Sequence, residues 1–239
     1  MHRSKLLINA CSQQGSRRKN NQDCIGVAGW RSNQGLSDLY SVELSRDELP
    51  AIFLLADGIG GHEKGEVASL TAIDMIFHHF APTQTEFNII PAVLEAHTVL
   101  TLNASSSYRP LGTTIVGLVL DSDGATVFNV GDSRALKLDD TSIIQISHDD
   151  VGKQTPQNVI TQSLGGGSKL PKLNPRKLSY CQDDTFVLVS DGISGWLEND
   201  DIHKIVKLNG ADSSLHLCSE AVRAGSGDDV SALVIKCSD

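Results

Sequence analysis

Two patterns of hydrophobic and polar positions alternate along this chain. Short runs rich in Val, Ile and Leu predict buried β-strands at residues 5–10, 23–28, 51–56, 113–120, 126–130, 134–138, 142–146, 185–190 and 230–237. Apolar side chains recur at helical spacing over residues 66–80, 90–100, 200–208 and 213–224, which predicts four helices. The first two of these helices are expected to form a hairpin.

The order of these elements favours a mainly antiparallel architecture. Strands, a helix pair, many strands, two further helices and a last strand follow one another, without the strict alternation of a doubly wound parallel sheet. We therefore expect an α+β sandwich covered by helices, and a single domain over residues 1–239. Residues 29–50, 104–111 and 151–158 fit neither pattern and are predicted to be surface loops.

Composition excludes several classes of protein. No apolar run approaches the roughly 18 residues that a membrane span needs, and the first residues are too short a patch for a secretory signal, so a cytoplasmic protein is expected. Five cysteines without a C-x-x-C pair predict buried thiols in a reducing compartment. A net charge of −9, with no basic cluster beyond Arg17-Arg18-Lys19, argues against nucleic-acid binding.

Acidic residues stand at the tips of four apolar runs. Asp57 follows AIFLLA, Asp132 follows VFNVG, Asp191 follows TFVLVS, and Asp228 precedes VSALVI. One such aspartate alone is usually a turn former that bonds its own backbone. Several carboxylates at one end of a sandwich, however, would repel one another unless cations lay between them. Because the donors are all oxygen, Mg²⁺, Mn²⁺ or Ca²⁺ is favoured over Zn²⁺.

The glycines after Asp57 match no nucleotide-binding motif. A P-loop would need lysine after Gly65, where Glu66 stands, and a dinucleotide fingerprint would need glycine at the position of Glu63. Glycine next to Asp57 suits a metal site instead, because a residue without a side chain lets its carbonyl approach an ion closely.

Eight segments together resemble the motifs of one family. They are RKNNQD (18–23), ADGIGGHEKGEVAS (56–69), LGTT (111–114), NVGDSRAL (129–136), SHDD (147–150), VITQSLGG (159–166), VLVSDGISGWL (187–197) and GSGDDVSALVI (225–235). In this order they resemble the metal-dependent Ser/Thr protein phosphatases of type 2C, the PPM family, and the small stand-alone bacterial members most. One match would be weak, whereas eight in the family's order make chance improbable.

The resemblance implies a fold and a metal centre. The fold is a four-layer αββα sandwich of two mainly antiparallel sheets flanked by helix pairs, with two Mn²⁺ or Mg²⁺ ions. Asp57 would bridge both ions, the Gly58 carbonyl would bind one, and Asp191 and Asp228 would hold the other. Asp23 would lie near the second ion, directly or through water. Asp132, with Asp191, matches a third and weaker metal position, so the number of bound ions could be two or three.

The resemblance also implies the reaction. A water molecule held between two divalent ions loses a proton near neutral pH and attacks the phosphorus of phosphoserine or phosphothreonine in line. Arg18 would bind the phosphoryl oxygens bidentately, and Asp57 and Asp191 are the other residues assigned to catalysis. No covalent intermediate is expected, and Ser133, Ser190 and Ser194 are predicted to be structural. The implied partners are phosphorylated proteins and an opposing Ser/Thr kinase in a signalling pathway, and we expect a monomer.

Four departures separate this chain from the family pattern. Gln22 replaces a glutamate that many eukaryotic members use as a ligand, and Ile59 replaces a histidine proposed as general acid, so water is expected to protonate the leaving group. Asp229 stands where asparagine is usual and adds a charge beside Asp228. Most members of the family have a flap of about twenty residues beside the cleft, although the lengths of such loops vary widely. In this chain only residues 151–157 correspond to it.

Two other functions stay open at this point. A catalytically weak module of the same fold could bind phosphorylated partners, although the principal acidic residues are all present. A hydrolase of small phosphoesters is also compatible with a cleft that the short flap leaves open.

Overall fold

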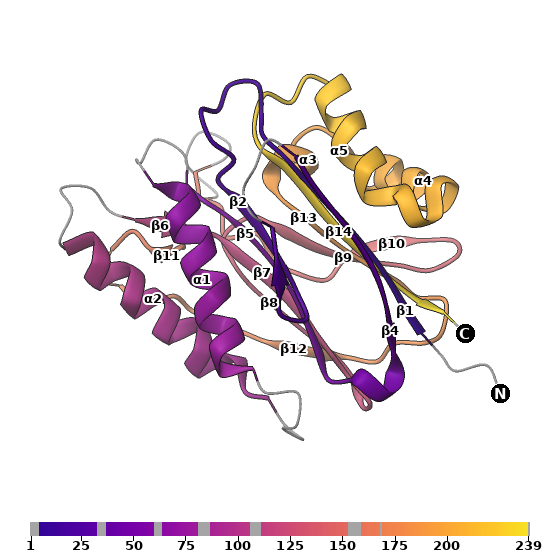
Figure 1. Ribbon diagram of the computed structural model, residues 1–239, viewed down its shortest axis with the longest axis horizontal. Coiled ribbons are helices and arrows are strands. Elements are labelled where there is room, and N and C mark those ends of the chain that lie inside the picture. The colour runs from indigo at the N-terminus through magenta and orange to yellow at the C-terminus, as the bar shows by residue number, and fades with distance from the viewer. Residues whose placement is uncertain are drawn as a thin grey trace.

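Two six-stranded sheets pack face to face in the computed structural model, and each outer face is covered by helices (Figure 1). The structure describes residues 5–32, 37–59, 64–80, 87–105, 111–152, 159–167 and 169–238. Every strand pairing that it records in the sheets is antiparallel. The predicted four-layer αββα sandwich is therefore confirmed.

The first sheet contains the first and the last strand, which pair with each other. In spatial order it contains β10 (Ile143–Gln145), β9 (Arg134–Leu138), β13 (Thr185–Val189), β14 (Val230–Ser238), β1 (Lys5–Gln13) and β4 (Ser37–Ser45). Its outer face carries α4 (Asn199–Asn209) and α5 (Ser213–Arg223), and α3 (Asp191–Ser194) follows β13 directly (Figure 1). The last strand thus lies inside the sheet, between β13 and the first strand.

The second sheet carries the helix hairpin. Its order is β12 (Arg176–Leu178), β8 (Gly124–Val130), β7 (Ile115–Asp121), β5 (Ala51–Asp57), β2 (Asp23–Val27) and β3 (Trp30–Arg31). Helices α1 (Gly65–His79) and α2 (Ile89–Ser105) cover it, and the short strands β6 (Gly112–Thr113) and β11 (Leu164–Gly165) pair nearby (Figure 1). Single 3-10 turns occupy Arg46–Glu48 and Gly210–Asp212.

Strand β5 shows why its sequence is apolar without alternation. Side chains of successive strand residues point to opposite faces, and both faces of this strand are covered. Phe53 and Leu55 pack in the core between the two sheets, whereas Ile52, Leu54 and Ala56 pack under α1 and α2. A third core lies between the first sheet and α4 and α5. The strand is fixed on two sides, which makes its carboxyl end a rigid support.

Two expectations are wrong. Residues 29–50 are not one loop, because Ser37–Ser45 forms β4 and pairs with β1 over its whole length. Only one face of this edge strand packs on the core, through Tyr40, Val42 and Leu44, so its sequence lacks a continuous apolar run. All five cysteines are free, but Cys181 is exposed whereas the other four are buried.

The described helices are all too short or too polar to span a membrane. The connection predicted as a shortened flap is described only at its ends, where Val151 bridges Ile160 and the Gly152 amide donates to the Val159 carbonyl over 3.1 Å. Residues 153–158 lie outside the described residues, as do His62 and Glu63.

Candidate metal centre

Strand ends from both sheets bring acidic residues together. Asp23 begins β2 and Asp57 ends β5, and the antiparallel register sets these two residues directly opposite each other. Asp191 begins α3 immediately after β13, and Asp228 lies two residues before β14. Like charges directly opposite each other on neighbouring strands are destabilising. The fold therefore concentrates negative charge at this end of the sandwich.

Burial and mutual repulsion raise the pKa values of Asp57 and Asp191. Burial is the largest cause that raises the pKa of Asp57 well above its usual range, followed by the charges of Asp23, Asp191 and Asp228. Burial, followed by the charge of Asp228, raises the pKa of Asp191. Asp57 and Asp191 are therefore costly to ionise here without a nearby cation.

Asp23 is the clearest of these cases. Its residue is fully buried, and neither carboxyl oxygen accepts a hydrogen bond from the described residues. Burial, together with the charges of Asp229 and Asp191, raises its pKa to about 8, although the nearby hydroxyls of Ser231 and Ser190 act in the opposite direction. Buried polar atoms are normally satisfied, so two carboxyl oxygens in this position fit the donor set of a cation.

Asp132 lies in the turn between β8 and β9 and lines the same pocket as Asp191. Its Oδ1 is buried and has no hydrogen-bond partner among the described residues. Burial followed by the charge of Asp191 raises its pKa to about 6. A pocket of 340 Å³ contains Asp132, Asp191 and Asp228 together. The donors thus fit hard divalent ions, although no three acidic, His or Cys side chains of the described residues stand in a ready ligand cage.

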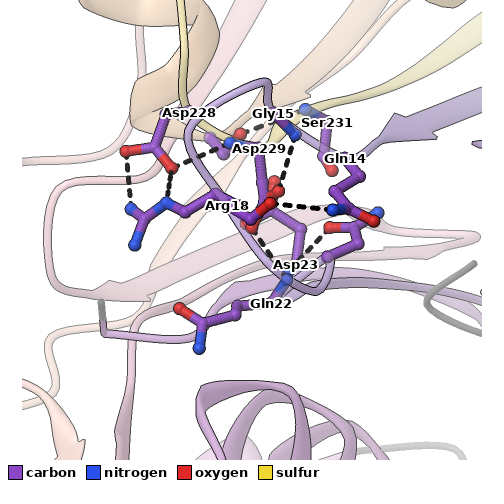
Figure 2. Close-up of polar contacts among 10 residues, drawn as sticks. Gln14, Gly15, Arg18, Gln22, Asp23, Asp228, Asp229 and Ser231 are labelled. Carbon is purple, nitrogen blue, oxygen red and sulfur yellow. Dashed lines mark hydrogen bonds and ion pairs between the residues drawn. The ribbon is translucent and has the colours of Figure 1, made fainter. Parts of the chain in front are cut away.

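Arg18 occupies both carboxylate oxygens of Asp228. Its Nε donates to Asp228 Oδ1 over 2.5 Å and its Nη2 donates to Oδ2 over 2.6 Å (Figure 2). The Asp228 side chain, through this hydrogen bond and its charge, raises the pKa of Arg18. Asp228 therefore points to the guanidinium and would have to turn from it to bind an ion.

Asp229 clasps the loop that carries Arg18. Its Oδ1 accepts from the Gly15 amide and its Oδ2 from the Gln22 amide, each over 2.8 Å (Figure 2). Gly15 is required at this contact, because a Cβ there would lie 2.2 Å from the Asp228 backbone carbonyl. The extra acidic residue thus has a structural partner at each oxygen, and the loop is fixed to the start of β14 at both ends.

The end of β5 is held just as closely. Thr113 Oγ1 and the Thr114 amide both donate to the Asp57 carbonyl over 2.8 Å, and the Asp57 amide donates to Thr114 Oγ1. Ser133 Oγ hydrogen-bonds Thr114 Oγ1, which links this strand to the turn of Asp132. The LGTT segment therefore positions the backbone of Asp57.

Gly58 follows in a crowded position. Its amide donates to the Gln22 carbonyl over 3.0 Å, and a Cβ on it would lie 2.4 Å from the Gly65 carbonyl oxygen. Ser69 Oγ donates to the same Gln22 carbonyl over 2.7 Å. Glycine is thus needed where β5 meets α1, while the Gln22 side-chain Oε1 is buried without a partner among the described residues.

Polar side chains near Asp23 are connected by hydrogen bonds. Asn21 Nδ2 donates to Ser12 Oγ and Ser231 Oγ donates to the same oxygen, both over 2.8 Å. The Ser231 amide donates to Ser190 Oγ over 3.1 Å. Ser133 and Ser190 are thus both hydrogen-bonded within the protein, and the structural role of Ser133, Ser190 and Ser194 stays a prediction.

The structure therefore brings most of the predicted residues to one place. Asp23, Asp57, Asp191 and Asp228 interact with one another, Gly58 adjoins them, Arg18 is bound to Asp228, and Asp132 lies across the same pocket. Sequence reasoning missed the clasp made by Asp229 and the support from Thr113 and Thr114. The only signal for Asp229 was its departure from the family pattern.

Comparison with known proteins agrees with this geometry. The sequence profile of the family "Protein phosphatase 2C" matches residues 26–220, which include Asp57, Asp132 and Asp191. A putative protein phosphatase 2C-type from Streptococcus pyogenes is 28% identical, and the match covers 80% of each chain. The serine/threonine phosphatase stp of Listeria monocytogenes is 26% identical over 68% of this chain and 74% of its own.

A solved structure extends the likeness to the whole fold. The catalytic domain of the serine/threonine protein phosphatase PstP, in complex with two manganese ions, is 25% identical and superposes with a TM-score of 0.76. The match covers 98% of this chain and 100% of that one. Since the family profile spans well over half of the sequence and the strand-end carboxylates fit its metal chemistry, the chain belongs to the protein phosphatase 2C family.

Proposed function

We propose that this protein is a serine/threonine phosphatase in which Asp23, Asp57, Gly58, Asp191 and Asp228 hold two Mn²⁺ or Mg²⁺ ions. The observation that carries the proposal is the buried Asp23 carboxyl. Asp23 is paired with Asp57 on the neighbouring strand, and its carboxyl oxygens accept no hydrogen bond from the residues that the structure describes. Two divalent ions at such a site would lower the pKa of a bound water molecule and neutralise the charge that develops on a phosphoryl group.

The protein's own residues position the substrate. Arg18 presents a planar guanidinium beside Asp228, and the same two nitrogens that now bind the carboxylate suit two oxygens of a phosphoryl group. The Asp229 clasp fixes the loop that carries Arg18, so the guanidinium is held near the carboxylates. The Thr113 and Thr114 contacts fix Asp57 in the same way.

Several finer assignments belong to the same proposal. Residues 1–239 form one phosphatase domain with a shortened flap at about 151–157. Asp132, with Asp191 in the same pocket, offers donors for a third ion. The protein acts in the cytoplasm as a monomer, on phosphorylated proteins whose Ser/Thr kinase it opposes.

Phosphate release from a phosphothreonine peptide tests the function. Activity is expected with Mn²⁺, is expected to vanish in EDTA, and is expected to fall at least a hundredfold in Asp57→Asn and in Asp191→Asn, because each ligand acts only with the others. Asp200→Asn, an exposed position on α4, is the matched control and retains wild-type activity. Full activity in EDTA would rule the metal site out.

A further inference from the structure

A second pocket adjoins the metal centre. It has a volume of 290 Å³ and contains Arg17, Arg18 and Gly227. It shares Asp228 and Trp196 with the pocket of 340 Å³ that holds Asp132 and Asp191. The two hollows together form a groove past the phosphoryl position assigned to Arg18, and Trp196 lies at their boundary. A substrate chain bound at the metal centre would extend along this groove.

Trp196 offers a fixed apolar surface in that groove. The residue is 44% exposed, so part of a large aromatic side chain is accessible to a ligand. Its ring lies against Gly225, where a Cβ would approach ring atom Cζ3 to 3.0 Å. The Trp196 amide donates to the Ile193 carbonyl over 3.0 Å, and the next residue, Leu197, packs in the core under α4 and α5. Glycine backing and a hydrogen-bonded backbone keep the exposed face in place.

Arg17 supplies positive charge in the same groove. Its amide donates to the Gly227 carbonyl over 2.9 Å, and its side chain lies along Gly227, where a Cβ would be 2.6 Å from Nε. Arg18 is paired with Asp228 and Arg134 with Asp149. Arg17 is exposed, and none of the ion pairs among the described residues includes it. Its guanidinium is therefore free to bind an anion.

We propose that Trp196 and Arg17 form a substrate subsite next to the phosphoryl position. An apolar side chain that flanks the phosphorylated residue packs on the Trp196 ring, and an anionic group of the same peptide, a carboxylate or a second phosphoryl group, pairs with Arg17. Aromatic side chains contribute a large contact area at little entropic cost, and a guanidinium binds either anion. The subsite rests on the proposed phosphatase function, because it selects among substrates of that reaction.

Phosphothreonine peptides with a glycine background test the apolar half. Phenylalanine replaces glycine at one of the two positions on either side, and kcat/KM is measured with Mn²⁺. Wild-type enzyme is expected to prefer the best phenylalanine peptide about tenfold, and Trp196→Ala is expected to lose that preference. Leu208→Ala, a more exposed apolar residue on α4, is the matched control and keeps it.

The charged half is measured in the same series. Glutamate or phosphoserine is placed near the phosphothreonine, and the preference over glycine is expected to be about threefold and to disappear in Arg17→Ala. Comparing the two peptides tells a carboxylate from a second phosphoryl group. Arg223→Ala, on the exposed face of α5, is the control and keeps the preference.

The outcomes separate the two proposals. If wild-type enzyme releases phosphate but shows no preference, or if Trp196→Ala and Arg17→Ala keep the preferences, the subsite is wrong while the phosphatase function stands. If the variants lose as much activity on an aryl phosphate, which has no flanking residues, as on the peptides, the subsite is wrong as well. A wild-type enzyme that releases no phosphate from any of these substrates overturns the function itself.

Discussion

Arg18 and Asp228 form a bidentate ion pair, with Nε 2.5 Å from Oδ1 and Nη2 2.6 Å from Oδ2. The guanidinium assigned to the phosphoryl group and a carboxylate assigned to an ion therefore bind each other. Asp228 cannot bind Arg18 and a metal ion in this way at the same time, because both of its carboxylate oxygens already accept from the guanidinium. Ion binding at Asp228 would thus release Arg18 toward the substrate.

Arg18→Ala is expected to raise KM for a phosphothreonine peptide about 10- to 100-fold and to lower kcat less, since two charge-assisted hydrogen bonds to the phosphoryl group are lost. Arg18→Lys keeps the positive charge but cannot donate two parallel hydrogen bonds, so its KM is expected to lie between those of wild type and Arg18→Ala. Steady-state kinetics with saturating Mn²⁺ give both constants, with Arg223→Ala as the control. An unaltered KM in Arg18→Ala would contradict the assignment.

Asp23→Asn is expected to stabilise the metal-free protein while it weakens Mn²⁺ binding. The substitution removes a buried carboxyl that faces Asp57 and has no described partner. A gain of about 1 kcal/mol in the free energy of unfolding would raise Tm by about 2–4 °C for a domain of this size. Thermal unfolding in EDTA measures the gain and calorimetric titration measures Mn²⁺ affinity. A lower Tm together with unchanged affinity would show that Asp23 is not a ligand.

The metal-free protein is expected to lose stability as pH rises from about 4 to about 8. The folded state raises the pKa of Asp23 to about 8 and that of Asp132 to about 6, whereas both groups ionise near 3.8 when unfolded. In this window the folded state binds more protons than the unfolded state, so the free energy of unfolding falls with pH.

Thermal unfolding in EDTA at pH 5.5 and pH 8 measures this pH effect. Mn²⁺ is expected to raise Tm more at pH 8, because ligands bind ions in their ionised form. Asp23→Asn should show a smaller fall in Tm between the two pH values than wild type. A metal-free Tm that increases toward pH 8 would be the opposite of what the buried carboxyls predict.

Asp229→Ala is expected to lower the free energy of unfolding by about 2–4 kcal/mol, because two backbone amides lose a charged acceptor. Asp229→Asn keeps one acceptor oxygen and is expected to cost about half as much. Urea denaturation measures both. The alanine variant should also have a reduced kcat/KM, since the clasp holds the loop of Arg18, and wild-type stability in Asp229→Ala would show that the clasp is unimportant.

The sequence predicted most of the strands for a physical reason. Strands such as β5 are buried on both faces, so Ile52 to Ala56 read as a continuous apolar run. Strand β4 escaped prediction because it lies at a sheet edge and packs only through alternate residues, Tyr40, Val42 and Leu44. That alternation is present in the sequence, but polar neighbours and an exposed Leu39 conceal it.

The site was predictable in its residues and not in its contacts. Acidic strand ends indicated where carboxylates would gather, and the antiparallel pairing of Asp23 with Asp57 supports that prediction. Nothing along the chain indicates that Asp229 would accept two amides over 200 residues away in sequence, or that Trp196 would remain exposed beside Asp228. Such contacts depend on how loops meet, which local patterns do not record.

The position of β14 between β13 and β1 has a consequence for biosynthesis. Asp228 and β14 are translated after the other strands of the first sheet, yet they complete the interior of that sheet and supply one carboxylate of the acidic cluster. A nascent chain that has not been translated through this strand lacks both. The enzyme is therefore expected to gain activity only after translation has passed Ser238, so that no incomplete product can remove phosphate from other proteins.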